Sequence, residues 1–313
     1  MLLQFKKKQV RTGNAFAKDV YEATFRSWAL GEKESQQREF ARYQAAAAAL
    51  IADVGARRAE AEAEAGVGGG AQAEAAGGPG GQGGRRRATT MPAFPFPEVR
   101  DGALRQPGGW PLDALTLLRQ AVATRGPFKD ALTAELAALR ASCATTSSSS
   151  LCDGAELSVA DVKSLGRVAQ KELFECAPAA YADGHREADV GAVKDMVRAM
   201  VSFRTMGGVA AFVEALTASE RLCVVRVKNR FEGDADNSGW HDLLLNVTVT
   251  PTAAAAAAAT ATAATAATAA GGGKPQQLHI CEVQVVLHQV RRLQLYMCSL
   301  ARERKCFLVL LLR

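Results

Sequence analysis

The sequence is poor in aromatic side chains and has no long apolar run. Aromatic residues make up 6% of the 313 residues, and much of the 48% hydrophobic content is alanine in low-complexity stretches. A folded core needs larger apolar side chains, so we expect the core to occupy only part of the chain. The apolar run near the end, FLVLLLR, is far too short to cross a membrane as a helix.

Cysteine pairs of the C-x-x-C type are also missing. The seven cysteines are scattered, which argues against a disulfide framework or a zinc ribbon and predicts a reducing compartment. His279, Cys281 and His288 do not predict a zinc site, because His288 falls on the opposite face of a strand and no fourth ligand is evident. The start of the chain carries no apolar run of signal-peptide length. We therefore expect an intracellular protein, cytoplasmic or chloroplast, with no secretory signal and no membrane span.

Composition divides the chain into four parts. We predict a helical N-terminal extension over 1–65, a flexible Gly/Ala/Pro-rich linker over 66–98, a helical segment over 99–150 and a folded domain over 151–313. The folded domain contains an Ala/Thr-rich insertion at 252–277. Because loop closure costs free energy only logarithmically in length, a loop this long should cost about 1.5–2 kcal/mol more than a tight hairpin. We expect the insertion to have no function of its own.

Two local patterns predict further helices. Residues 111–124 and 127–141 are expected to form a helical pair, with Pro127 in the first turn of the second helix. Ser158 and Asp161 form an S-x-x-D capping box, which predicts that a helix begins there.

Alternating apolar residues predict strands in the second half of the chain. The strands are expected at 195–203, 222–229, 242–250 and 278–287, with a helix after the first of them. A basic C-terminal helix would follow the last strand. This order of elements predicts an α+β fold, in which a mixed sheet of about four to five strands is flanked by helices.

Basic residues gather at both ends of the chain and in one short segment. Lys and Arg outnumber Asp and Glu in 1–42 and 289–313, and the net charge is +6. Lys163, Arg167 and Lys171 recur at i, i+4 and i+8, so they would share one side of a helix. These groups suit an anionic partner such as a nucleotide or RNA. The alternative is a solvated basic face.

Two acidic residues stand among apolar ones. Asp195 opens a predicted strand, and Glu282 lies in the middle of another. A carboxylate in apolar surroundings costs several kcal/mol unless it is paired or binds a metal. If neighbouring strands present both on one face, the two could hold Mg²⁺ against a nucleotide triphosphate. The alternative is simple ion pairing, of Asp195 with Lys194 or Arg198 and of Glu282 with Arg226 or Lys228.

The stretch 227–247, VKNRFEGDADNSGWHDLLLNV, places charges before a turn and an aromatic residue after it. Lys228 would lie near phosphates, Trp240 could stack on a base, and His241 could bind a phosphate. A core position for Trp240 and an exposed turn position for His241 are the alternatives.

Four motifs in this order resemble the synthetase domain of the RelA/SpoT family, the pyrophosphokinases that make guanosine tetra- and pentaphosphate. They are VKSLGRVAQK (162–171), VKDMVRAMV (193–201), VKNRFEGDADNSGW (227–240) and CEVQV (281–285). The resemblance covers about 155–290 and is nearest to a divergent eukaryotic branch, while the alanine, glycine and threonine tracts are typical of an algal source.

The resemblance implies a nucleotidyltransferase-like fold, Mg²⁺ as cofactor, and ATP with GDP or GTP as substrates. It makes Asp195 a Mg²⁺ ligand, and Glu282 a second ligand or the base that activates the acceptor hydroxyl. It places Lys163 and Lys171 at the donor phosphates, Lys228 near the acceptor phosphates and Trp240 on the guanine. The candidate substrate-binding set is completed by Arg167, Arg198, His241 and Gln284.

The chain also departs from the family pattern. The loop before Trp240 is acidic, with Asp234 and Asp236 where the family has Pro-Lys, and Val286 and Leu287 replace an Arg-Thr pair. These changes leave an alternative function open. The domain would then be a catalytically inactive module that binds a nucleotide, RNA or a protein.

Overall fold

The computed structural model describes residues 19–20, 22–23, 25–27, 33–68, 99–100, 103–106, 112–145, 154–171, 190–232, 241–250 and 279–293. No helix within these ranges is long and apolar enough to cross a membrane. The predicted linker beyond residue 68, the insertion at 252–277 and Trp240 lie outside the described residues.

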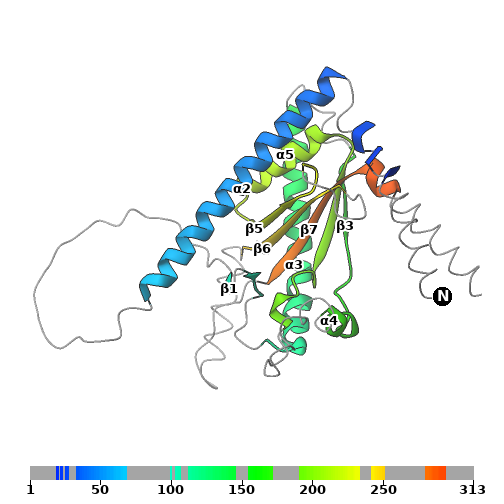
Figure 1. The fold of residues 1–313 in the computed structure, drawn as a ribbon. Coiled ribbons are helices and arrows are strands. Elements are labelled where there is room, and N and C mark those ends of the chain that lie inside the picture. Colours follow the sequence, from blue (N-terminus) through cyan, green and yellow to red (C-terminus); the bar gives the residue numbers. More distant parts are fainter. Residues whose placement is uncertain are drawn as a thin grey trace, which may run out of the picture.

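A five-stranded mixed sheet forms the centre of the fold (Figure 1). Its strands lie in the order β3-β4-β7-β6-β5, with β4 and β7 parallel and all other neighbours antiparallel. The strands are β3 (Glu156–Val159), β4 (Arg198–Phe203), β5 (Leu222–Asn229), β6 (Leu243–Val249) and β7 (Ile280–Leu287). The predicted α+β class with a mixed sheet of four to five strands is confirmed.

Helices and a small hairpin surround this sheet. They are α2 (Glu34–Gly68), α3 (Ala114–Thr145), α4 (Leu165–Lys171), α5 (Met206–Thr217), a 3-10 turn (Val190–Ala192), and the two-residue strands β1 (Val99–Arg100) and β2 (Ala103–Leu104). Figure 1 shows the long α2 running beside α5, with α4 at the far end of the sheet. A further helical stretch at 288–293 follows β7 directly.

Strand alternation gives the sheet one apolar face and one polar face. Val201, Phe203, Val283 and Val285 are buried on the apolar face, where Phe203 contacts Phe212 of α5 with ring centroids 5.5 Å apart. Large buried side chains of α2, α3 and α5 join the same cluster. Burial of this apolar area is the main source of stability for such a layered fold.

The polar face carries a row of charged and amide side chains across four strands. Strand register places Arg226 opposite Asn246, Asn246 opposite Glu282, and Glu282 opposite Arg198. Directly paired residues point to the same face of a sheet, so these four side chains share one surface. Gln284 lies two residues after Glu282 on that surface.

The predicted capping box at Ser158 is wrong. Ser158 lies in β3, paired with Met200 of β4, and the helix begins only at Leu165. Asp161 accepts a hydrogen bond from Arg125 of α3 instead of capping a helix. A short edge strand contains too few residues for its alternation to outweigh a local capping pattern.

The predicted break before Pro127 is also wrong, because α3 is one continuous helix with Pro127 inside it. Leu117, Phe128 and Leu132 are all buried, so the apolar stripe continues past the proline. Packing of that stripe offsets the cost of roughly 3 kcal/mol that a proline imposes inside a helix.

Strand β4 starts at Arg198, three residues later than predicted, so Asp195 precedes the strand.

The N-terminal helix α2 packs on α5 and on edge strand β5, with Tyr43, Ala47 and Leu50 fully buried. The domain boundaries predicted from composition stay a prediction.

Candidate active site

Asp195 lies in a buried position between two ammonium groups. Lys163 donates a hydrogen bond to Asp195 Oδ2, and Lys171 Nζ lies 2.9 Å from the same oxygen. Asp195 is 9% exposed and Lys163 is 8% exposed. The local partners expected as the alternative, Lys194 and Arg198, form no ion pair with Asp195 among the described residues.

Backbone contacts bring these three residues together. The Lys163 amide donates to the Met196 carbonyl at 3.1 Å, next to Asp195 in the chain. Lys171 is the last residue of α4, and its ammonium group contacts the same oxygen of Asp195. Arg167, on the same short helix, is exposed and donates to Gln170 at 2.5 Å. Of the three basic residues predicted to act together, two meet at Asp195 and Arg167 does not.

The two lysines keep Asp195 ionised. Burial alone would raise the pKa of Asp195, but the hydrogen bonds from Lys163 and Lys171 outweigh it and lower that pKa. Burial in turn lowers the pKa of Lys163, against the raising effect of Asp195. The Lys163 ammonium therefore depends on the carboxylate beside it.

Glu282 lies on β7 next to this cluster. Its amide donates to the Val197 carbonyl at 2.9 Å, and its side chain lies opposite Arg198 in the parallel β4–β7 pair. Burial raises the pKa of Glu282, and the negative charge of Asp195 raises it further. The two carboxylates are therefore close enough for the charge of one to affect the other. No ion pair to Glu282 occurs among the residues that the structure describes.

Two features of these carboxylates bear on whether they could hold a divalent cation. Asp195 Oδ1 is buried and accepts no hydrogen bond from any residue that the structure describes, so it is available as a ligand. A cation beside Glu282 would offset the burial and repulsion that raise its pKa. Within the described ranges no group of three or more His, Cys, Asp or Glu side chains could hold a metal. Further ligands for Mg²⁺ would then come from water or phosphate, as is usual for this ion.

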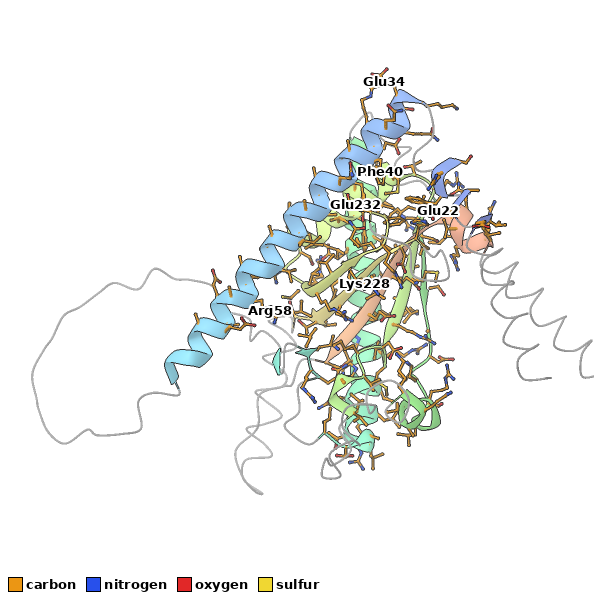
Figure 2. The ribbon with its side chains drawn as sticks, viewed as in Figure 1. Glu22, Glu34, Phe40, Arg58, Lys228 and Glu232 are labelled. Atoms are coloured by element: carbon orange, nitrogen blue, oxygen red, sulfur yellow. The ribbon has the colours of Figure 1, made fainter. Side chains whose placement is uncertain are left out.

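The predicted substrate-binding residues Arg198, Lys228 and Gln284 share the polar face. Arg198 and Lys228 are exposed on β4 and β5. Figure 2 shows Lys228 over the strands, below Glu232 and Glu22. Gln284 Nε2 donates to Asp242 Oδ2 at 2.5 Å. Their roles in binding stay predictions.

His241 is buried two residues before β6 and has partners from distant parts of the chain. Its Nε2 lies 2.9 Å from Glu22 Oε2, and its Nδ1 lies 3.0 Å from the Arg230 carbonyl oxygen. The Phe25 ring stacks on the imidazole with centroids 4.1 Å apart. His241 is therefore not at an exposed turn, and both of its ring nitrogens already have partners within the protein.

Sequence reasoning missed the residues that surround these candidates. Asp242 is fully buried, and its carboxylate accepts hydrogen bonds from Nε and Nη2 of Arg230, both at 2.5 Å. Asn246 is 1% exposed, and neither its amide nitrogen nor its amide oxygen has a hydrogen-bond partner in the described part of the chain. The polar letters H-D before an apolar strand were the available signal for Asp242, but nothing in the sequence pointed to Glu22 or Phe25.

Comparisons with known proteins gave matches only among solved structures. No protein-family model and no curated protein matches the sequence. Small alarmone synthetase 1 from Bacillus subtilis, bound to its product pppGpp, is 16% identical, with 61% of this chain and 79% of that chain covered and a TM-score of 0.38. A GTP pyrophosphokinase family protein from Streptococcus pneumoniae is 13% identical, with 59% and 75% covered and a TM-score of 0.38. A Streptococcus mutans protein gives 13% identity, 59% and 77% coverage and the same TM-score.

Proposed function

We propose that the chain is a Mg²⁺-dependent nucleotide pyrophosphokinase of the RelA/SpoT type, with a nucleotidyltransferase-like fold. It would move a pyrophosphoryl group from ATP to a hydroxyl of GDP or GTP, in guanosine tetraphosphate metabolism. The observation that carries the proposal is that Asp195 and Glu282 lie near each other in the fold. They are far apart in the sequence, yet they lie at one end of the parallel β4–β7 pair, close enough for Asp195 to raise the pKa of Glu282.

In this proposal Asp195 and Glu282 hold the cation. When bound, Mg²⁺ would neutralise charge on the phosphates of the donor nucleotide. Asp195 would offer Oδ1, because Oδ2 is already engaged by Lys163 and Lys171. Lys171 is the more exposed of the two lysines and can reach a donor phosphate, whereas Lys163 is buried on Asp195.

The transfer requires a base near the acceptor hydroxyl. That oxygen would attack the β-phosphorus of ATP, the bond from this phosphorus to the α–β bridging oxygen would break, and AMP would leave. Glu282 would take the hydroxyl proton. Beside the cation Glu282 would be ionised, and an ionised carboxylate next to the acceptor hydroxyl can take its proton.

A catalytically inactive module that binds a nucleotide or RNA is the second candidate. The burial of His241 favours it, because that side chain is engaged by Glu22 and Phe25 and is withdrawn from any phosphate. The module would bind nucleotide without turnover. Binding that weakens as salt rises would indicate phosphate contacts.

Transfer of label from ATP distinguishes the two candidates. Purified protein is incubated with Mg²⁺, GDP or GTP, and ATP labelled at its γ-phosphate. The pyrophosphokinase predicts labelled product together with an equal amount of AMP and no ADP. Asp195→Asn and Glu282→Gln should each lower the rate at least about a hundredfold. Asp161→Asn is the matched control, because that carboxylate is exposed and lies in the same segment as Lys163.

Undiminished product in the Asp195→Asn, Glu282→Gln double variant would overturn the proposed mechanism. Nucleotide binding by calorimetry without any transfer would favour the inactive module. Formation of ADP in place of AMP would indicate a simple kinase instead.

A further inference from the structure

A chain of contacts links the N-terminal segment to the polar face of the sheet. It begins at Glu22 and Phe25, which contact His241 at the start of β6. Phe25 also stacks on Phe231, with centroids 5.6 Å apart, and the edge of Tyr43 packs on the same ring. These contacts cover the end of β5 and the start of β6 with an aromatic cluster.

Both ring nitrogens of His241 face hydrogen-bond acceptors. The Arg230 carbonyl oxygen, 3.0 Å from Nδ1, can only accept. The Glu22 carboxylate, 2.9 Å from Nε2, also accepts when ionised, and the hydrogen bond from His241 lowers the pKa of Glu22. Both contacts are hydrogen bonds only if His241 is an imidazolium. A stacked Phe25 ring favours that cation further.

Arg230 connects His241 to the residues at the start of β6. Its guanidinium binds both oxygens of the buried Asp242, and its amide donates to the Asp242 carbonyl at 2.9 Å. We call this Arg230–Asp242 pair the platform. Asp242 Oδ2 in turn accepts from Gln284 Nε2 at 2.5 Å. Bidentate, charge-assisted pairs of this kind fix side-chain geometry.

We propose that Glu22 and Phe25 are positioning residues of the nucleotide site: they hold protonated His241 on the platform and so fix the orientation of Gln284. This inference rests on the proposed function and gives a role there to the N-terminal segment.

The orientation of Gln284 limits which ligand groups it can bind. Its Nε2 donates one hydrogen to Asp242, which leaves the second N–H and the amide oxygen for a ligand, both held in a fixed plane. The amide oxygen can accept from an N–H or O–H donor while the remaining N–H donates to a neighbouring acceptor. A guanine edge, which offers donors and an acceptor side by side, fits this fixed amide.

The Glu22 carboxylate sets how this link responds to acid. Arg26 shares that carboxylate with His241, since its Nε donates to Glu22 Oε1 at 3.3 Å. As pH falls, protonation of Glu22 removes the same link, but only below the ordinary carboxyl range because its pKa is lowered.

Nitrogen NMR of histidine tests the link without any nucleotide. The chain has four histidines, so selective ¹⁵N labelling with a His241→Gln variant assigns the signal. We expect His241 of the full-length protein to show two protonated nitrogens at neutral pH, and a Glu22→Ala variant to lose that signature. A neutral ring with an unprotonated Nε2 would overturn the inference, whether or not the protein binds nucleotides.

Calorimetry of nucleotide binding tests the positioning role. Glu22→Ala and Phe25→Leu should each raise the Kd for GDP roughly five- to tenfold and leave the Kd for Mg²⁺–ATP analogue within about twofold, a split on the scale of one lost charge-assisted contact. Arg42→Ala is the matched control, because its exposed pair with Glu214 also joins the N-terminal part of the chain to the rest of the fold but lies outside the chain of contacts. Equal weakening for both nucleotides, or unchanged GDP binding, would contradict the positioning role. If wild-type protein binds neither nucleotide but shows two protonated nitrogens on His241, the proposed function is contradicted and the contacts from Glu22 to Gln284 are still supported.

Discussion

The Asp195 carboxylate is surrounded by charges that the sequence does not place beside it. Lys163 is 32 residues away in the chain, yet it is the closest partner, and Lys171 reaches the same oxygen. Sequence reasoning identified all three residues as candidates, but the ion pairs that it considered for Asp195 as the alternative to a metal were with its sequence neighbours Lys194 and Arg198. Which cation neutralises a buried acid depends on tertiary packing, and periodicity within one element carries no information about it.

Replacing Lys163 should measure how strongly this cluster is coupled. We expect Lys163→Met to lower the free energy of unfolding by about 2 kcal/mol, less than the roughly 3–5 kcal/mol for an isolated buried pair, because Lys171 remains at Asp195. Urea titration of Lys163→Met, Asp195→Asn and the double variant would give the coupling. The double variant should be less destabilised than the two single losses added together. Simple additivity would contradict a buried, interacting pair.

Glu282 should behave as a carboxylate that costs stability when it is ionised. Its pKa is raised in the folded state, so its ionised form destabilises the fold, and that cost grows as pH rises through the raised pKa. We expect Glu282→Gln to raise the melting temperature at pH 8 by a few degrees and to have little effect at pH 4. Thermal denaturation at both pH values is the measurement. A variant that is less stable than wild type at pH 8 would show that Glu282 is paired instead.

At the scale of single elements, alternation predicted the central strands well. β5, β6 and β7 lie within a residue or two of their predicted bounds, and Glu282 and Gln284 point away from the core as expected. β3 was missed because it is a four-residue edge strand with polar letters. Local motifs at Ser158 and Pro127 suggested helix boundaries, and packing overrode both.

The helix α2 offers two adjacent residues that test its packing. Leu50 is fully buried in the core shared with the sheet, whereas Ile51 is 45% exposed. We expect Leu50→Ala to lower the free energy of unfolding by about 3 kcal/mol and Ile51→Ala by less than about 0.5 kcal/mol. Chemical denaturation followed by circular dichroism would measure both. Similar small losses for the two variants would mean that α2 does not pack on the rest of the fold.

At the scale of the whole molecule, the sequence predicted the class of fold but not which distant segments contact one another. Composition marked residues 1–65 as an extension, yet side chains from this part of the chain contact Asn229, Gly207 and His241 in the sheet half. Weak helical periodicity shows that a helix forms, and it does not show what covers its apolar side. Contacts across so long a stretch of chain became visible only in the folded arrangement.

The insertion between β6 and β7 should be dispensable for the fold. The two strands pair in register up to Thr248 and Ile280, so a short turn could join them. Replacing 252–277 with a tight hairpin loop should raise the free energy of unfolding by about 1.5–2 kcal/mol, since a shorter loop closes at lower entropic cost. Denaturant titration and the label-transfer assay would be compared with full-length protein. Loss of stability or of transfer would assign the insertion a role.

Binding of a divalent cation by Asp195 and Glu282 together is the central claim, and paramagnetic Mn²⁺ in place of Mg²⁺ tests it most directly. Electron paramagnetic resonance would count bound Mn²⁺ in the presence of a non-hydrolysable ATP analogue, for wild type, Asp195→Asn, Glu282→Gln and the control Asp161→Asn. The predicted result is tight Mn²⁺ binding in wild type and the control that is lost in either of the other two variants. Tight binding that persists in both Asp195→Asn and Glu282→Gln would show that these carboxylates do not form the metal site.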